Sequence, residues 1–203
     1  MSEYPDWLPA DEVRMKETVK FMNGGAGRIL DIGMKYGFTL EAVFGLEKVG
    51  IDTNPVYLET VKKRGIIKDA RLCDVHKMPF EDKIFDCIIF TEVLEHIEKP
   101  DEAIAEISRV CRGRLILSTP NNCWARRVKH FLLRKPNFIS PQHVREYSWK
   151  EVKVMVERHG FKLTRFRGLG FFLTYRPYPF WEPFGRLFPW LSADMLMEFE
   201  KDV

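Results

Sequence analysis

The sequence has 203 residues, of which 45% are hydrophobic and 30% are charged. Such a composition is typical of a soluble globular chain and argues against intrinsic disorder. The formal charge of +3 is far below the clustered basic excess of a dedicated nucleic-acid binder. The first residues lack the basic and apolar regions of a signal peptide, and no stretch of roughly 18 apolar residues offers a membrane span. We therefore expect a single cytoplasmic domain over residues 1–203.

The four cysteines give no sign of a metal or disulfide site. They are spread along the chain without a C-x-x-C pair, which is the spacing that zinc sites and redox motifs use. We expect all four to be reduced and mostly buried; they are Cys73, Cys87, Cys111 and Cys123.

Apolar runs with the length of strands alternate with helical patterns from residue 28 onward. The runs are RILDI, KVGID, ARLCD, FDCIIF and RLILST, with DMLMEFEKD as a last strand near the end of the chain. This alternation is the signature of an α/β fold, a Rossmann-like, mainly parallel sheet with helices on both faces.

Helix signals stand between the first of these strands. Asn54 can cap a helix that has Pro55 in its first turn and Gly65 as its stop. After the first strand, the stretch GFTLEAVFGL leaves room for only about two helical turns before KVGID.

Two later segments also carry helix signals. Residues 99–113 repeat apolar side chains at helical spacing, and the predicted buried face consists of Ala103, Ile104, Ile107, Val110 and Cys111. Ser148 and Glu151 have the spacing of a capping box, and Gly160 closes the helix that they begin.

The segment RILDIGMKYGFTL ends its strand in a turn with two glycines, Gly33 and Gly37. Glycine lets the backbone approach a ligand closely at the carboxyl edge of a parallel sheet. A dinucleotide fingerprint would need glycine at positions 33, 35 and 38, but Lys35 and Phe38 occupy the last two. A bound pyrophosphate is therefore disfavoured.

The turn instead resembles motif I of the class I S-adenosylmethionine (SAM) methyltransferases, D/E-x-G-x-G-x-G, at Asp31, Gly33 and Gly37. Lys35 departs from the motif at its middle glycine. A lysine there would crowd the cofactor, fold its stem outward, or bring its ammonium to the carboxylate of the methionine moiety. We expect SAM binding to be retained, with Lys35 merely filling space.

Further stretches match the same family in the same order, over residues 27 to about 165. Asp52 ends the next strand, 21 positions after Asp31, where a carboxylate can accept hydrogen bonds from both ribose hydroxyls. The resemblance places Asp74 at the adenine amino group, Val75 beside the ring and Thr91 near the methionine end. It continues through LEHIEKP, LSTPNN and HVREYSWKEV.

These stretches are similar to small-molecule methyltransferases of the ubiquinone-biosynthesis and type 11 or 12 kind. The resemblance implies a seven-stranded sheet with SAM at the topological switch point, in-line transfer of the methyl group, and no metal. The cofactor-binding residues that it implies are Asp31, Gly33, Met34, Gly37, Asp52, Thr53, Asp74, Val75 and Thr91.

Catalytic residues are harder to name, because in-line transfer gains most of its rate from alignment. His96, just beyond the fourth strand and beside Glu95, is a candidate general base. A histidine in LEHI can equally cap or brace the following turn, and the same two interpretations apply to His143. We interpret Tyr147 as a packing residue.

The acceptor must be recognised by segments outside these motifs. Residues 124–135 combine an apolar helical face with Arg and Lys around it, and residues 171–190 are dense in aromatic residues and prolines. We expect a lid at 121–147 and an aromatic wall at 171–190 over a small-molecule or lipid-like acceptor; peripheral membrane contact and a lid over a soluble acceptor both stay open. An ordinary surface helix and a homodimer contact are the alternatives.

Nucleic acid is an unlikely acceptor, because TEVL stands after the fourth strand in place of the NPPY-type tetrapeptide of amino methylases. We therefore expect a SAM-dependent methyltransferase for a small or lipid-like acceptor. The alternative is a methyltransferase-like fold that binds SAM weakly or not at all and acts as a non-catalytic partner subunit, which Lys35 favours.

Overall fold

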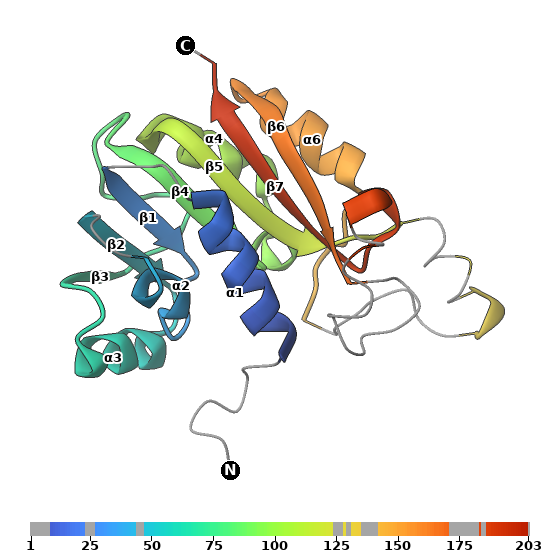
Figure 1. Cartoon of the computed structure of the whole chain (residues 1–203). Helices are drawn as coiled ribbons and strands as arrows, with labels where there is room; N and C mark the ends of the chain where they lie inside the picture. The colour runs from blue at the N-terminus through green and yellow to red at the C-terminus, as the bar shows by residue number, and fades with distance from the viewer. Residues whose placement is uncertain are drawn as a thin grey trace.

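The computed structural model describes residues 9–22, 27–43, 47–123, 142–170 and 186–202, together with 128, 131–134 and 183. Within these residues, seven strands form one sheet in the order β3-β2-β1-β4-β5-β7-β6 (Figure 1). The strands are β1 (Arg28–Ile32), β2 (Glu47–Asp52), β3 (Asp69–Leu72), β4 (Phe85–Thr91), β5 (Cys111–Pro120), β6 (Phe161–Leu169) and β7 (Asp194–Lys201). All pairings among β1 to β5 are parallel, whereas β7 lies antiparallel to both β5 and β6. The predicted fold class is confirmed.

Helices cover both faces of the sheet. They are α1 (Pro9–Met22), α2 (Phe38–Glu41), α3 (Pro55–Arg64), α4 (Pro100–Val110) and α6 (Trp149–Glu157), with short 3₁₀ turns η1 (Leu94–His96) and η2 (Pro189–Leu191). One apolar cluster joins the sheet to α4 and α6, and a second joins the other face to α1, α2 and α3. Among the described residues, no helix is long and apolar enough to span a bilayer.

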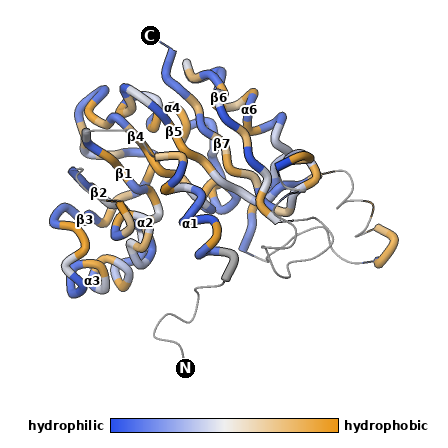
Figure 2. Tube along the Cα trace, in the orientation of Figure 1, coloured by the Kyte–Doolittle hydropathy of each residue, from blue (hydrophilic) through white to orange (hydrophobic). Residues whose placement is uncertain are grey.

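The central strands are buried on both faces because helices cover each side. Leu30 in β1, Ile88 in β4 and Leu115 in β5 are fully buried, and hydrophobic residues run along the middle of the sheet (Figure 2). Parallel strands covered in this way read as nearly continuous apolar runs. This is why five of them could be recognised in the sequence.

The predicted caps of α3 and the N-terminal cap of α6 are present, whereas α6 ends at Glu157 with Arg158 as its C-cap and not at Gly160. The Asn54 side chain accepts from the Val56 N–H at 2.9 Å, and Gly65 closes α3 in the left-handed conformation. Ser148 and Glu151 form the expected capping box. The side chains of these helices thus satisfy backbone groups that would otherwise lack partners.

Some predicted bounds were wrong. Cys111 is not on the face of α4 but begins β5, because its backbone is extended (φ −86°, ψ 130°). β3 ends at Leu72, so Asp74 follows the strand rather than ending it. The short helix expected after the first strand is present as α2, with four residues. The helix α1 and the strand β6 were not predicted.

The cysteines are free, and three of the four are buried, as expected. Most of the aromatic segment 171–190 and of the amphipathic segment 124–135 lies outside the described residues.

Candidate functional site

The strand order reverses between β1 and β4, so the loops after these strands diverge at the carboxyl edge of the sheet. Open α/β sheets bind ligands at such a switch point. Two adjoining hollows lie there and share Gly33. We call them the α1 hollow, between α1 and the turn at residues 33–37, and the β2 groove, beyond the ends of β2 and β3.

The turn after β1 is held against the end of β2. Gly33 N–H and Met34 N–H both donate to the Ile51 carbonyl, at 2.9 and 3.3 Å. Gly33 has φ 71°, and a Cβ there would lie 2.5 Å from Cγ2 of Val93. Only glycine therefore fits this position, both for its backbone angle and for lack of space.

Gly37 also has a positive φ, of 74°, and stands at the N-cap of the short helix α2. It supports the turn rather than lining either hollow. Met34 and Thr91, both expected at the cofactor, do line the α1 hollow.

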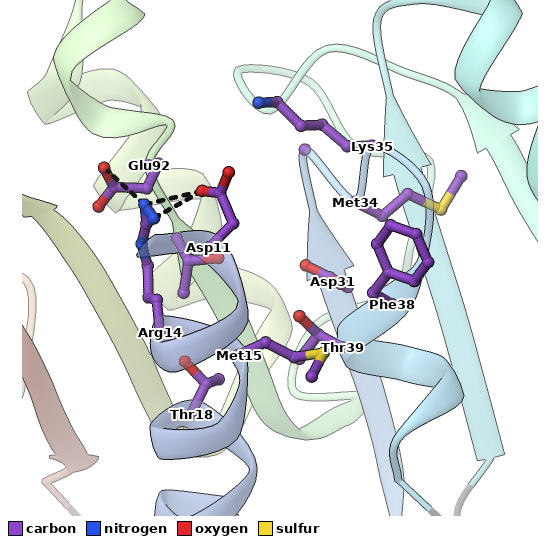
Figure 3. A pocket seen from close by; sticks show the side chains of 12 residues that line it. Asp11, Arg14, Met15, Thr18, Asp31, Met34, Lys35, Phe38, Thr39 and Glu92 are labelled. Carbon is purple, nitrogen blue, oxygen red and sulfur yellow. Dashed lines mark hydrogen bonds and ion pairs between the residues drawn. The ribbon is translucent and has the colours of Figure 1, made fainter. Parts of the chain in front are cut away.

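Lys35 occupies the middle glycine position of the motif with φ 45°. Residues other than glycine adopt this left-handed backbone conformation at a cost in free energy. The side chain of Lys35 is exposed, and Lys35 is one of the residues that line the α1 hollow. Figure 3 shows the stem extending from the turn above Asp31, toward the side of α1. A contact of its ammonium with a bound carboxylate therefore stays open.

The Asp52 carboxylate stands at the mouth of the β2 groove, beside Thr53. One oxygen accepts from Lys35 N–H at 3.0 Å and the other from Asn54 N–H at 2.8 Å. Each carboxylate oxygen has two lone pairs. The backbone therefore fixes this carboxylate while leaving each oxygen one further lone pair for a ligand hydroxyl.

Asp74 and Val75 line the same groove, so the structure brings together the residues expected at the ribose and the adenine. The Asp74 carboxylate accepts from His76 N–H at 2.9 Å and lies 2.6 Å from Nδ1 of that histidine. The backbone hydrogen bond from His76 is the main reason that the pKa of Asp74 is lowered. His76, which was not predicted, also lines the groove.

Asp31 lies at the floor of the α1 hollow (Figure 3). It is buried, and burial together with the nearby charge of Asp52 raises the pKa of Asp31 to about 8. A carboxyl group in this environment favours a positively charged ligand group, which would compensate its charge.

The far wall of the α1 hollow comes from α1 and from the end of β4. Arg14 contacts Asp11 at 2.8 Å and Glu92 at 3.4 Å (Figure 3). Glu92 also accepts from the Ser118 hydroxyl at 2.9 Å, and burial raises its pKa. Sequence reasoning missed this wall, although Asp11 and Glu12 near the start of α1 and Lys20 near its end are typical helix-end signals.

The two candidate catalytic histidines lie together. His96 lines the β2 groove, and its ring packs edge-on against that of His143, with centroids 5.0 Å apart. Tyr147 is fully buried in the core, which confirms that it is a packing residue.

The comparisons with known proteins agree with this geometry. Residues 30–117 match a family model described as Methyltransferase domain. The phosphatidylethanolamine N-methyltransferase of Cereibacter sphaeroides is 28% identical over 104 residues, 48% of this chain and 51% of that protein. A ubiquinone/menaquinone biosynthesis C-methyltransferase of Paraburkholderia phytofirmans is 36% identical over 63 residues, 30% of this chain and 26% of that protein. The chain thus matches about half or less of the length of these curated relatives.

A solved structure shares the whole arrangement. The magnesium protoporphyrin IX methyltransferase of Synechocystis, solved with bound SAH (S-adenosylhomocysteine), has a TM-score of 0.73 at 15% identity and covers 98% of this chain and 91% of its own. Residues 30–117 are thus similar to a methyltransferase domain, and the chain shares the fold of a class I SAM-dependent methyltransferase.

The left-handed backbone of Lys35 leads to a prediction about stability. Lys35→Gly should raise the free energy of unfolding by about 0.5 to 1 kcal/mol, because the relief of strain exceeds the entropy that glycine adds to the unfolded chain. Chemical denaturation measures this. The matched control is Lys68→Gly, another exposed lysine without a positive φ, which should lose stability. A Lys35→Gly protein no more stable than wild type would contradict the prediction.

The raised pKa of Asp31 predicts a pH dependence. The folded protein keeps this proton up to about pH 8, whereas the unfolded chain releases it near the ordinary value of 3.8. Stability therefore falls as pH rises between these values. Asp31→Asn removes this pH dependence. The free energy of unfolding of the variant should therefore rise relative to that of wild type from pH 5 to pH 8, by on the order of 1 kcal/mol per pH unit.

Denaturation curves at several pH values test this, with Asp69→Asn as control. Asp69 is hydrogen-bonded to Arg71 and has a lowered pKa, so it is ionised in both states throughout this range. If the difference in free energy of unfolding between wild type and Asp31→Asn is the same at every pH, Asp31 is already ionised at pH 5 and the prediction is wrong.

Proposed function

We propose that this protein transfers a methyl group from SAM to a small-molecule or lipid-like acceptor. The observation that carries the proposal is the fixed Asp52 carboxylate at the end of β2, between the glycine turn and the β2 groove. The ligand would lie across Gly33, where a Cβ would collide with Val93. The match of residues 30–117 to a methyltransferase domain and the SAH bound to the Synechocystis structure of the same fold support the same ligand.

The residues present fit the two ends of SAM. Asp52 would accept the ribose hydroxyls, and Asp74 with Val75 would face the adenine. Asp31 and Thr91, in the α1 hollow, would hold the methionine portion, whose ammonium suits the buried carboxyl.

When bound, SAM supplies an electrophilic methyl group on a positively charged sulfur. Because charge disappears as the methyl leaves, the chain's main task is to align the acceptor and to exclude water. The α1 wall, held by the contacts of Arg14 to Asp11 and Glu92, would close the methionine side. His96 lines the β2 groove and its ring packs against His143, and the acceptor would enter on this side.

The test of this function is binding of SAM and SAH by calorimetry. Asp52→Ala should weaken both by about 1.5 to 3 kcal/mol, as expected for hydrogen bonds to a charged group. Asp69→Ala, which removes an acidic side chain from β3 outside the two hollows, should leave the affinity unchanged. No binding by wild type would favour the non-catalytic partner subunit, and equal affinity in Asp52→Ala would refute the placement of the ribose.

An exposed apolar surface with basic neighbours supports a lipid-like acceptor. Phe131 and Leu132 are 81% and 72% exposed, and they belong to a segment rich in Arg and Lys. An apolar surface with basic neighbours suits the interface of an anionic membrane. The similarity to a phosphatidylethanolamine N-methyltransferase supports a lipid-like acceptor in the same way.

Vesicle sedimentation tests the membrane contact. Wild type should sediment with anionic vesicles at low salt and be released at high salt, since each Lys or Arg contributes on the order of 1 kcal/mol. Changing Arg126, Arg127 and Lys129 to glutamate should abolish binding. A control with Lys62 and Lys63 of α3 changed to glutamate should still bind. Wild type remaining in the supernatant at low salt would leave only a soluble acceptor.

A further inference from the structure

Three side chains that can bind a metal converge beside the β2 groove. Glu95 and His96 lie in η1, directly after β4, and His143 lies in the segment before α6. One ligand atom from each side chain lies within 4.8 Å of the other two. Because the histidines are 47 positions apart in the sequence, only the fold brings this set together.

The backbone fixes the relative position of the two segments. The Glu95 carbonyl accepts from the N–H groups of Val144 and Arg145, at 2.9 and 3.3 Å. The His96 ring reaches back across the same junction, with Nδ1 3.1 Å from the Gln142 carbonyl. The chain that carries His143 is therefore tied at three points to the turn that carries Glu95 and His96.

Each of the three side chains has a second partner that orients it. Glu95 accepts from the Thr119 hydroxyl at 3.0 Å. His96 has its Nδ1 at the Gln142 carbonyl, and His143 has its Nδ1 3.5 Å from the buried Glu146 carboxylate. Histidines that bind metals usually donate their other ring nitrogen to a carbonyl or a carboxylate. With Nδ1 of His96 at a carbonyl, Nε2 is the nitrogen of that ring left for a ligand.

The charge balance also favours a cation. Glu95 is 1% exposed, so a charge on its carboxylate would be shielded from solvent. A divalent ion bound beside such a buried carboxylate would compensate this charge. Two imidazoles and one carboxylate suit Zn²⁺ or a similar first-row ion better than Mg²⁺ or Ca²⁺, which prefer all-oxygen ligands.

We propose that Glu95, His96 and His143 form a binding site for one divalent transition-metal ion, with Zn²⁺ as the reference ion. Three protein ligands leave a coordination position open, as in catalytic zinc sites. This role replaces the general-base role expected for the two histidines and revises the expectation that no metal takes part.

If the proposed function holds, the open position defines the class of acceptor. Because His96 also lines the β2 groove, an acceptor hydroxyl could bind the ion there and become more acidic. Its proton would pass to solvent, and the new oxygen–methyl bond would form as the sulfur–methyl bond breaks. The acceptor would therefore be an alcohol or phenol.

The test is titration of the chelator-treated full chain with Zn²⁺ by calorimetry and with Co²⁺ by absorption. Wild type should bind one ion per chain. Glu95→Gln, His96→Ala and His143→Ala should each weaken binding at least tenfold. The control is His159→Ala, because His159 also lies near a carboxylate, 3.4 Å from Asp101, but outside the site; it should bind as wild type does.

The Co²⁺ spectrum should lack a thiolate charge-transfer band, which excludes the cysteines as ligands. Circular dichroism of every variant reports whether it is folded, and the SAH affinity of wild type tests the proposed function separately. Wild type that binds SAH but no ion would overturn the metal site alone. The same holds if the three variants bind the ion as wild type does, or if the spectrum shows thiolate ligands. Ion binding without SAH binding would leave the metal site standing and overturn the methyltransferase proposal.

Discussion

The contact between the turn after β1 and the end of β2 is the constraint on which the site depends. Gly33 and Met34 donate to the Ile51 carbonyl, and Lys35 donates to the Asp52 carboxylate. These bonds fix the path of the turn and the orientation of the carboxylate at the same time. They also bring the turn so close to Val93 that position 33 accepts only glycine. A change in this contact would therefore alter both hollows together.

The electrostatics of the α1 hollow follow from its burial. Asp31 and Glu92 are carboxyl groups whose pKa values burial raises, and Arg14 is the cation that faces Glu92. Such a hollow disfavours anions and stabilises a ligand that brings positive charge. SAM carries positive charge on both its sulfonium and its ammonium, whereas a dinucleotide would bring a pyrophosphate. The sequence argument against a dinucleotide and the charge of the hollow thus agree.

Sequence reasoning reached most of the sheet because buried parallel strands are apolar along their whole length, as in FDCIIF of β4. It also expected Asp52 and Asp74 at one cofactor, and both line the β2 groove, since they lie at or just beyond the ends of neighbouring strands. It missed α1, because the apolar residues of this helix are not clearly gathered on one face. It therefore also missed Arg14, which lies on α1. It also treated His96 and His143 separately, because their convergence depends on the loop path between β5 and α6. A contact between segments that far apart leaves no local pattern.

The most direct test of the account is a crystal structure of the protein with SAH. The account predicts the ribose hydroxyls within hydrogen-bonding distance of Asp52, the adenine beside Asp74 and Val75, and the amino-acid end between α1 and the turn at residues 33–37. SAH bound in another place, or in this groove with the ribose turned away from Asp52, would contradict it.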